Sequence, residues 1–511
     1  MDTTLLRRWL CVFWLLLAAI ALTIFVFRID AVVRQGPYYV TTGFEDISIY
    51  SISRIRHGDP VYVDCFTYPY RASLFNWLFY QVYGGAARLL DPSENLLPLT
   101  LRLVTLTFAL GGFAALLGFL QTGESDGLSP SVRLLLTCYA VVVWFSPFVG
   151  WWSITARPDI PAMTCELLGV LLVVRGGARL SWPAAILAGV LFFCAWSFKQ
   201  SAIGLFAGSM LALALRREWA NLLRVSLTTA LLTGVVLAIA LPQPAYVANL
   251  FAAPALAPMD NGQLGVILFG CTLAWGPLLL VGPALVLLGQ SSAERKALFS
   301  ERSVGMLGVV TATVLVLNVL AARRPGCSGN YFFETWLAGM TLGGLIQRRL
   351  LTEGITFAKA ADRLLFLAFT GLLLAFSMLS VIPVFDPLHK PDTQIVELML
   401  RLPRPPYSEE MLAAMRASPK PLFCDDPLLA LQALGVDAGD VPAIDHTIYW
   451  DAGRAGKLSQ PDILKRIEAR QYENIWLYIR RTEWEPFVRK AGYVLTWEDG
   501  DYRQFTKPGA R

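Results

Sequence analysis

Eleven apolar runs, most of them close to twenty residues long, constrain this chain more than any other feature. A membrane-spanning helix needs about twenty predominantly apolar residues. The runs lie at 9–27, 99–121, 132–149, 160–175, 183–198, 201–215, 222–241, 265–288, 304–321, 331–347 and 363–384. Only 16% of the residues are charged, against about 25% in a typical soluble domain. The sequence therefore predicts an α-helical polytopic membrane protein of about eleven transmembrane helices, and nothing in its charge indicates a nucleic-acid partner.

The stretch 183–215 determines the predicted transmembrane topology, because Lys199 and Gln200 stand at its middle. A single helix there would hold a cation at mid-membrane, at a cost of roughly 2.5–3.5 kcal/mol. A hairpin that turns at Lys199 avoids this cost. The hairpin also puts most arginines and lysines of the short loops on one side, as the positive-inside rule requires. We therefore expect a cytoplasmic N-terminus and Lys199 on the extracytoplasmic side.

This orientation places two long segments outside the cytoplasm. In the predicted transmembrane domain, 1–384, residues 28–98 form a first periplasmic loop with amphipathic stretches at 45–56 and 73–90, suited to a membrane interface. A proline-rich linker follows at 385–418, and 419–511 read as a small periplasmic α/β domain. In that domain we expect strands in "KPLFC" and "ENIWLYI", a helix in "SQPDILKRIEAR" capped by Ser459, and a hairpin that turns at "DGD".

Polar side chains near the predicted membrane ends gather on the extracytoplasmic side, from five separate segments. They are Glu45 and Asp46, Tyr68 and Arg71, Arg157 and Asp159, Lys199 and Gln200, and finally Arg323, Asn330, Tyr331 and Glu334. Each has a structural explanation on its own, as an interfacial anchor, a helix cap, a helix-dipole partner or a solvated loop charge. Chance would scatter such groups over both sides. Their common side therefore indicates a functional site.

These groups suit the transfer of a sugar from a polyprenyl phosphate. The departing phosphate needs cations, for which Arg157, Lys199 and Arg323 are candidates. The acceptor hydroxyl must lose its proton to a carboxylate, and Asp46 or Glu45 fits this role of general base. The other polar residues would bind or position the substrates. We expect no cofactor and no metal, because the three histidines are scattered and no cysteine has metal-site spacing.

With these motifs the chain resembles the GT-C superfamily of integral-membrane glycosyltransferases, and most of all the bacterial protein O-mannosyltransferase and aminoarabinose-transferase-like family (family 39). The shared landmarks are the acidic pair, "HGDPVYVD", "TYPYRASLFNWLFYQVYG", "ARPDIPAM", "SFKQSAI" and "GNYFFETW", in order along 1–384. The resemblance implies inverting transfer from a polyprenyl-phosphate sugar at the periplasmic face of the bacterial inner membrane, without a nucleotide-sugar donor.

The chain departs from the family pattern at two places. The usual Asp-Glu pair is reversed, so Glu45 matches the leading acid by position and Asp46 by type. We prefer Asp46 and keep both as candidates. Tyr70 replaces the second proline of the family's Y-P-P-like turn, with Arg71 beside it.

Two other classes of function stay open at this stage. A polymerase or ligase of lipid-linked glycans, or an oligosaccharyltransferase-like enzyme, would use a larger donor linked through pyrophosphate. A transporter or flippase would need polar groups near mid-membrane and often has inverted repeats, whereas the sequence shows no internal repeat. For the preferred function, the acceptor would be a lipid, glycan or protein of the cell envelope.

Overall fold

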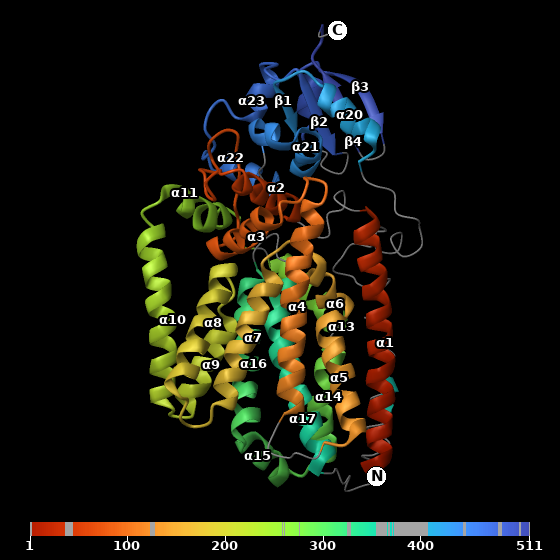
Figure 1. Ribbon diagram of the computed structural model, residues 1–511, viewed down its shortest axis with the longest axis vertical. Coiled ribbons are helices and arrows are strands. Elements are labelled where there is room, and N and C mark those ends of the chain that lie inside the picture. The colour runs from red at the N-terminus through yellow and green to blue at the C-terminus, as the bar shows by residue number, and fades with distance from the viewer. Residues whose placement is uncertain are drawn as a thin grey trace.

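The computed structural model is a bundle of helices capped at one end by a smaller α/β domain (Figure 1). It describes residues 3–35, 44–122, 128–257, 259, 261–274, 276–323, 329–353, 365, 368–369, 371–372, 407–442, 446–478, 483–499 and 502–509. The predicted linker before residue 407 and most of the predicted span 363–384 lie outside these residues.

The bundle is built from helices that follow most of the predicted apolar runs. They are α1 (Thr3–Gln35), α4 (Leu97–Gln121), α5 (Pro130–Phe145), α6 (Pro147–Gly150), α7 (Asp159–Arg175), α8 (Trp182–Phe198), α9 (Gly204–Leu215), α10 (Trp219–Ala240), α11 (Pro244–Val247), α12 (Ala253–Ala255), α13 (Asn261–Ala274), α14 (Gly276–Gly289), α15 (Ser292–Ser300), α16 (Arg302–Ala321) and α17 (Phe333–Glu353). Short turns of other helix types occur at Trp152–Ile154, Ala248–Ala252, Gly329–Phe332 and Gly435–Asp440.

Among the described residues, four helices are long and apolar enough to cross a membrane, namely α1, α4, α10 and α16. A fifth span results if α5 and its continuation Pro147–Ile154, bent by 41°, count as one. Several other apolar helices, such as α8 and α9, are shorter. The number of eleven spans therefore stays a prediction, whereas the helical class and the apolar helices are confirmed.

The hairpin predicted around Lys199 is present. Helix α8 ends at Phe198 and α9 begins at Gly204, so 183–215 is not one helix. The two arms pack against α7 and α16. The close approach of α9 to α16 depends on Gly208, because a Cβ there would lie 2.9 Å from the Val310 Cα. The short arms are thus held by neighbouring helices inside the bundle.

The first loop forms α2 (Glu45–Arg56) and α3 (Trp77–Leu90). We expected both to lie at a membrane interface, but α2 differs, since every residue from Glu45 to Ile55 is buried. It is packed between α3, α4 and the C-terminal helix α21 (Pro427–Leu434). Helix α3 keeps an amphipathic character, with Leu89 and Leu90 exposed at its end.

The C-terminal domain has a four-stranded sheet in the order β1-β2-β4-β3, with β1 parallel to β2 and the other pairs antiparallel. The strands are β1 (Leu422–Cys424), β2 (Asn474–Tyr478), β3 (Val494–Asp499) and β4 (Tyr502–Thr506), and the helices beside α21 are α20 (Glu409–Ala417), α22 (His446–Arg454), α23 (Ile463–Glu468) and α24 (Glu485–Lys490). The expected strands and hairpin are present. The cap of α23 is Asp462 and not Ser459, because the Asp462 carboxylate accepts the Lys465 N–H at 2.9 Å.

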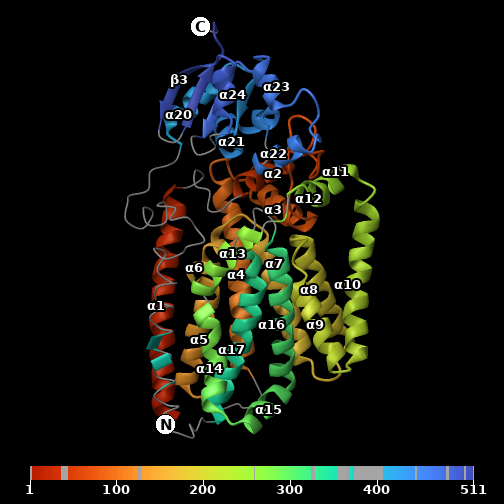
Figure 2. The same cartoon turned by 180° about the vertical axis from the view of Figure 1, so that it is seen from behind.

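The C-terminal domain and the first loop share one end of the bundle, and the N-terminus and α15 lie at the other (Figures 1 and 2). Ser459 does not cap a helix as expected but connects the C-terminal domain to the first loop. Its hydroxyl accepts the Tyr68 N–H at 3.0 Å, and its carbonyl accepts the Tyr70 hydroxyl at 2.6 Å. The first loop and the C-terminal domain were both expected outside the cytoplasm, and their position at the same end of the bundle agrees with that expectation.

Candidate functional site

Asp159, the first residue of α7, is the centre of a buried charge cluster. The Lys199 Nζ lies 2.6 Å from its Oδ1, and the Asn330 amide donates to the same oxygen at 2.8 Å. The Arg157 Nε lies 3.2 Å from its Oδ2. Three segments that the sequence places far apart thus meet at one carboxylate. Because the Asp159 side chain is only 1% exposed, the two cations are held where water screens them little.

Aromatic rings enclose the Arg157 guanidinium. Its Cζ lies 4.6 Å from the ring centre of Trp152, 5.3 Å from that of Phe75 and 5.7 Å from that of Phe44. Cation–π attraction holds a guanidinium in such a setting without neutralising its charge. Since Phe44 directly precedes α2, this contact brings the acidic pair of α2 to the edge of the cluster.

A small cavity of about 40 Å³ opens beside Asp159 and is lined by five of the predicted residues. These are Asp159, Lys199, Asn330, Tyr331 and Glu334. The Lys199 Nζ lies 5.3 Å from the ring centre of Tyr331. Such a volume admits a few waters but not a whole sugar, so a sugar-sized ligand would have to displace side chains on entry.

Two buried polar residues of this cavity, Glu166 and Asn318, were not among the predicted site residues. Both lie inside apolar runs. Glu166 follows Asp159 by seven residues, which is two helical turns, so their common face of α7 could have been read from the spacing. Asn318 donates to Glu334 Oε2 at 2.8 Å, while the Gly204 N–H donates to Oε1 at 3.1 Å. Glu334 thereby connects α16, α17 and the start of α9.

Glu45 is fully buried and engaged through both carboxylate oxygens. Arg102 of α4 donates to Oε1 at 2.9 Å and to Oε2 at 3.1 Å, and the Ala156 N–H donates to Oε1 at 2.8 Å. Glu45 therefore fixes the backbone next to Arg157. Arg102 was not among the predicted site residues, because it stands within the predicted span 99–121 and Glu45 is 57 residues away in the sequence.

Asp46 is also buried, but it lies on the side of the C-terminal domain. The pKa of Tyr407 is raised well above its usual value, chiefly by burial and next by Asp426, with a smaller contribution from the Asp46 charge. The Tyr407 hydroxyl donates to Asp426 Oδ2 at 2.8 Å. Polar groups of the C-terminal domain thus stand close to the preferred candidate base, which the sequence did not predict.

Tyr68 and Arg71 contact groups other than those around Asp159. The ring of Tyr68 lies 3.8 Å from the guanidinium carbon of Arg466 in the C-terminal domain. The Arg71 Nη1 lies 3.9 Å from Asp59 within the same loop. Neither residue is among those that line the cavity beside Asp159.

Gln200 and Arg323 also make contacts outside the charge cluster. The Gln200 amide donates to the Leu74 carbonyl at 3.0 Å, which ties the α8–α9 turn to the first loop. The Arg323 Nε donates to the Asn261 side chain at 2.9 Å, at the start of α13. The charge cluster therefore contains two of the three predicted cations, Arg157 and Lys199.

The arrangement offers phosphate-binding cations, buried carboxylates and a neighbouring acidic pair. Within the described ranges, no group of three or more His, Cys, Asp and Glu side chains is placed to hold a metal ion. The side chains present can stabilise an anion electrostatically and can transfer a proton to a carboxylate.

Comparison with solved structures identifies the fold. No protein-family model matches the chain, and no curated protein matches its sequence. The crystal structure of ArnT from Cupriavidus metallidurans bound to undecaprenyl phosphate aligns with a TM-score of 0.58 at 11% identity, covering 97% of this chain and 98% of that one. The apo structure of the same protein gives a TM-score of 0.56 at 11% identity, covering 96% and 97%. The predicted resemblance to GT-C membrane glycosyltransferases is thus confirmed as a likeness of fold over nearly the whole chain.

Proposed function

We propose that this chain is a membrane glycosyltransferase that moves a sugar from a polyprenyl-phosphate donor to an acceptor in the cell envelope, on the extracytoplasmic face of the bacterial inner membrane. The observation that carries the proposal is the buried Asp159 cluster, which holds Lys199 and Arg157 beside a small cavity. The shared fold supports it, since one of the matching ArnT structures is described as bound to undecaprenyl phosphate.

In the proposed reaction, Lys199 and Arg157 stabilise the leaving phosphate. The bond between the anomeric carbon and the phosphate oxygen breaks, and that oxygen keeps the electron pair. Two cations held in a poorly hydrated site oppose this developing charge strongly. Asp159 keeps both in place before the donor arrives, with Nζ at 2.6 Å and Nε at 3.2 Å from its carboxylate.

We assign the general base to Asp46 and a positioning role to Glu45. Both oxygens of Glu45 already accept hydrogen bonds from Arg102 and Ala156, so its carboxylate is poorly disposed to take a proton. Adjacent residues on a helix point about 100° apart, which directs Asp46 away from Arg102. Attack of the acceptor oxygen opposite to the leaving phosphate gives inversion at the anomeric carbon.

Replacement of the two acids tests the assignment. Asp46→Asn should lower the transfer of a labelled lipid-linked sugar by about 10²–10⁴-fold, as the loss of a general base does, with donor binding unchanged. Glu45→Gln should lower activity together with the thermal midpoint, because it breaks a buried ion pair. Asp91→Asn, at a carboxylate 81% exposed in the same loop, is the matched control. Normal transfer by both the Asp46 and the Glu45 variants would refute the proposed mechanism.

The proposed orientation has its own test. Single cysteines introduced at Gln200 and in the C-terminal domain should react with a membrane-impermeant maleimide added outside spheroplasts. A cysteine at Arg179, between α7 and α8, should react only after the membrane is opened. Labelling of the first two sites from the cytoplasmic side alone would overturn the proposed location of the reaction.

A further inference from the structure

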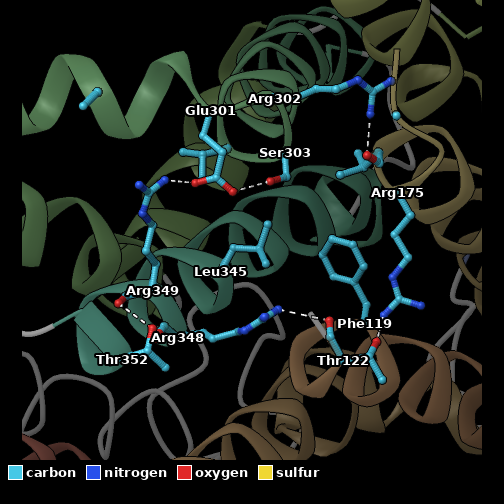
Figure 3. Close-up of a pocket in the computed structure, with 14 residues that line it drawn as sticks. Phe119, Thr122, Arg175, Glu301, Arg302, Ser303, Leu345, Arg348, Arg349 and Thr352 are labelled. Carbon is cyan, nitrogen blue, oxygen red and sulfur yellow. Dashed lines mark hydrogen bonds and ion pairs between the residues drawn. The ribbon is translucent and has the colours of Figure 1, made fainter. Parts of the chain in front are cut away.

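A second and much larger cavity lies at the other end of the bundle. Its volume is about 1160 Å³, and it lies among the ends of α4, α7, α16 and α17 (Figure 3). Its charged lining consists of Arg175, Arg302, Arg348, Arg349 and Glu301. The lining is therefore strongly cationic, with four guanidinium groups against one carboxylate.

This cavity is separate from the proposed donor site, although the same helices line both. Helix α16 contributes Arg302 to the large cavity and Ala321 to the small one. These residues are 19 steps apart, or about 28 Å along the axis at 1.5 Å per residue. Helix α17 likewise contributes Arg348 to one and Glu334 to the other. The separation is close to the thickness of a bilayer core, about 30 Å, so the two cavities face opposite sides of a membrane.

Two of the four arginines are already neutralised. Arg302 contacts Glu218 at 2.8 Å and also donates to the Val173 carbonyl. Arg349 is paired with Glu301. Because these two arginines are paired with carboxylates, the net positive charge of the cavity comes from the other two, Arg175 and Arg348.

Arg175 and Arg348 converge on the end of α4 with no carboxylate of the described residues within 4.0 Å of either. Arg175 Nη2 donates to the Thr122 hydroxyl and, at 2.8 Å, to the Gly118 carbonyl. Arg348 Nη1 donates to the Thr122 carbonyl at 3.1 Å. Figure 3 shows both side chains meeting at Thr122 from opposite sides. Two positive charges are thus brought to one residue without an anion between them.

Capping of the last carbonyls of α4 accounts for part of this geometry. It does not account for all of it, because a guanidinium has five N–H donors. Within the described residues, Arg175 donates hydrogen bonds through Nη2 alone and Arg348 through Nη1 alone. The remaining donors form a fork that matches the oxygens of a phosphate, and a bound anion would remove the repulsion between the two charges.

We propose that this cavity binds the phosphate headgroup of an anionic membrane lipid, with Arg175 and Arg348 as its principal ligands. Basic pockets between helices at the cytoplasmic surface are a recurrent setting for such headgroups. Phe119, Val304 and Leu345 also line the cavity and supply an apolar wall for the start of the acyl chains. The volume exceeds what one inorganic phosphate needs, which favours a lipid over a free ion as the source of the phosphate.

Lipid retention by the purified full chain tests the proposal. The protein is reconstituted in phosphatidylcholine bilayers with or without cardiolipin, and bound cardiolipin is counted by native mass spectrometry after extraction. Arg175→Gln and Arg348→Gln should each weaken retention about tenfold, as expected for the loss of a charge-assisted hydrogen bond, and Arg348→Lys should keep part of it. Arg179→Gln is the control, because Arg179 is an exposed arginine on the α7–α8 turn that does not line the cavity.

A second experiment distinguishes a lipid ligand from a soluble phosphate ligand. Wild-type protein in lipid-free detergent should gain a higher thermal midpoint from cardiolipin than from inorganic pyrophosphate, and the gain should vanish in Arg348→Gln. Equal stabilisation by pyrophosphate, removed by the same substitution, would overturn the assignment to lipid. Cardiolipin retention unchanged in both glutamine variants, or lost equally in Arg179→Gln, would overturn the site itself. If one glutamine variant fails to fold, the other and Arg348→Lys decide the matter.

Discussion

Replacing Asp159 with asparagine would remove the carboxylate that Lys199, Arg157 and Asn330 all contact. The Lys199 Nζ lies 2.6 Å from it, and the Lys199 side chain is 14% exposed, so water cannot take over as a full partner. Removal of one member of a buried ion pair typically costs 3–5 kcal/mol, because the other charge stays buried. Asp159→Asn should therefore lower the free energy of unfolding by about 3–5 kcal/mol.

A double-mutant cycle of Asp159→Asn with Lys199→Met measures how strongly the two side chains are coupled. Each single variant leaves one charge unpaired, whereas the double variant removes the Asp159–Lys199 pair as a whole. Arg157 still lacks its carboxylate in the double variant, so the recovery is partial. We expect the double variant to be more stable than the sum of the two losses predicts, by about 1–3 kcal/mol.

Thermal unfolding in detergent, followed by tryptophan fluorescence, measures the cycle. For a chain of this size, 1 kcal/mol corresponds to roughly 1–2 °C in the thermal midpoint, so the single variants should lose roughly 3–10 °C. The double variant should recover stability but no glycosyl transfer, because the proposed phosphate ligand is gone. Losses that add within about 0.5 kcal/mol would refute the view that Asp159 and Lys199 form a coupled buried pair.

Two further predictions concern the packing around the site. Gly204→Ala should lower the free energy of unfolding by about 1–3 kcal/mol and reduce transfer, because a Cβ would lie 2.4 Å from the Glu334 Oε2. The control is Gly234→Ala, which should leave stability unchanged in the same thermal assay, because no atom lies within 4 Å of its Cβ. Tyr70→Phe should cost about 1 kcal/mol by removing the 2.6 Å hydrogen bond to the Ser459 carbonyl. Limited proteolysis should then release the C-terminal domain earlier, and an unchanged cleavage rate would contradict a docking role for Tyr70.

Local patterns in the sequence were sufficient for the helices, the Lys199 hairpin and the C-terminal strands. The length of an apolar run indicates a membrane span, a cation in the middle of such a run indicates a turn, and alternation of apolar and polar residues indicates a strand. Each of these signals is contained in a short stretch of adjacent residues. The GT-C resemblance also rests on short motifs in order, and the comparison with ArnT confirms it as a likeness of fold. The gathering of Asp159, Lys199 and Asn330 followed from placing five segments on one side of a membrane.

The sequence by itself thus determined the membrane class, the main helices and which polar groups share an end of the bundle. Only the tertiary structure decided the partners: Arg102 for Glu45, the C-terminal domain for Asp46, and Glu166 as a lining residue of the cavity. The physical reason is distance along the chain. A pattern within twenty residues fixes an element and its buried face, but contacts across 57 residues, as between Glu45 and Arg102, depend on how whole helices pack.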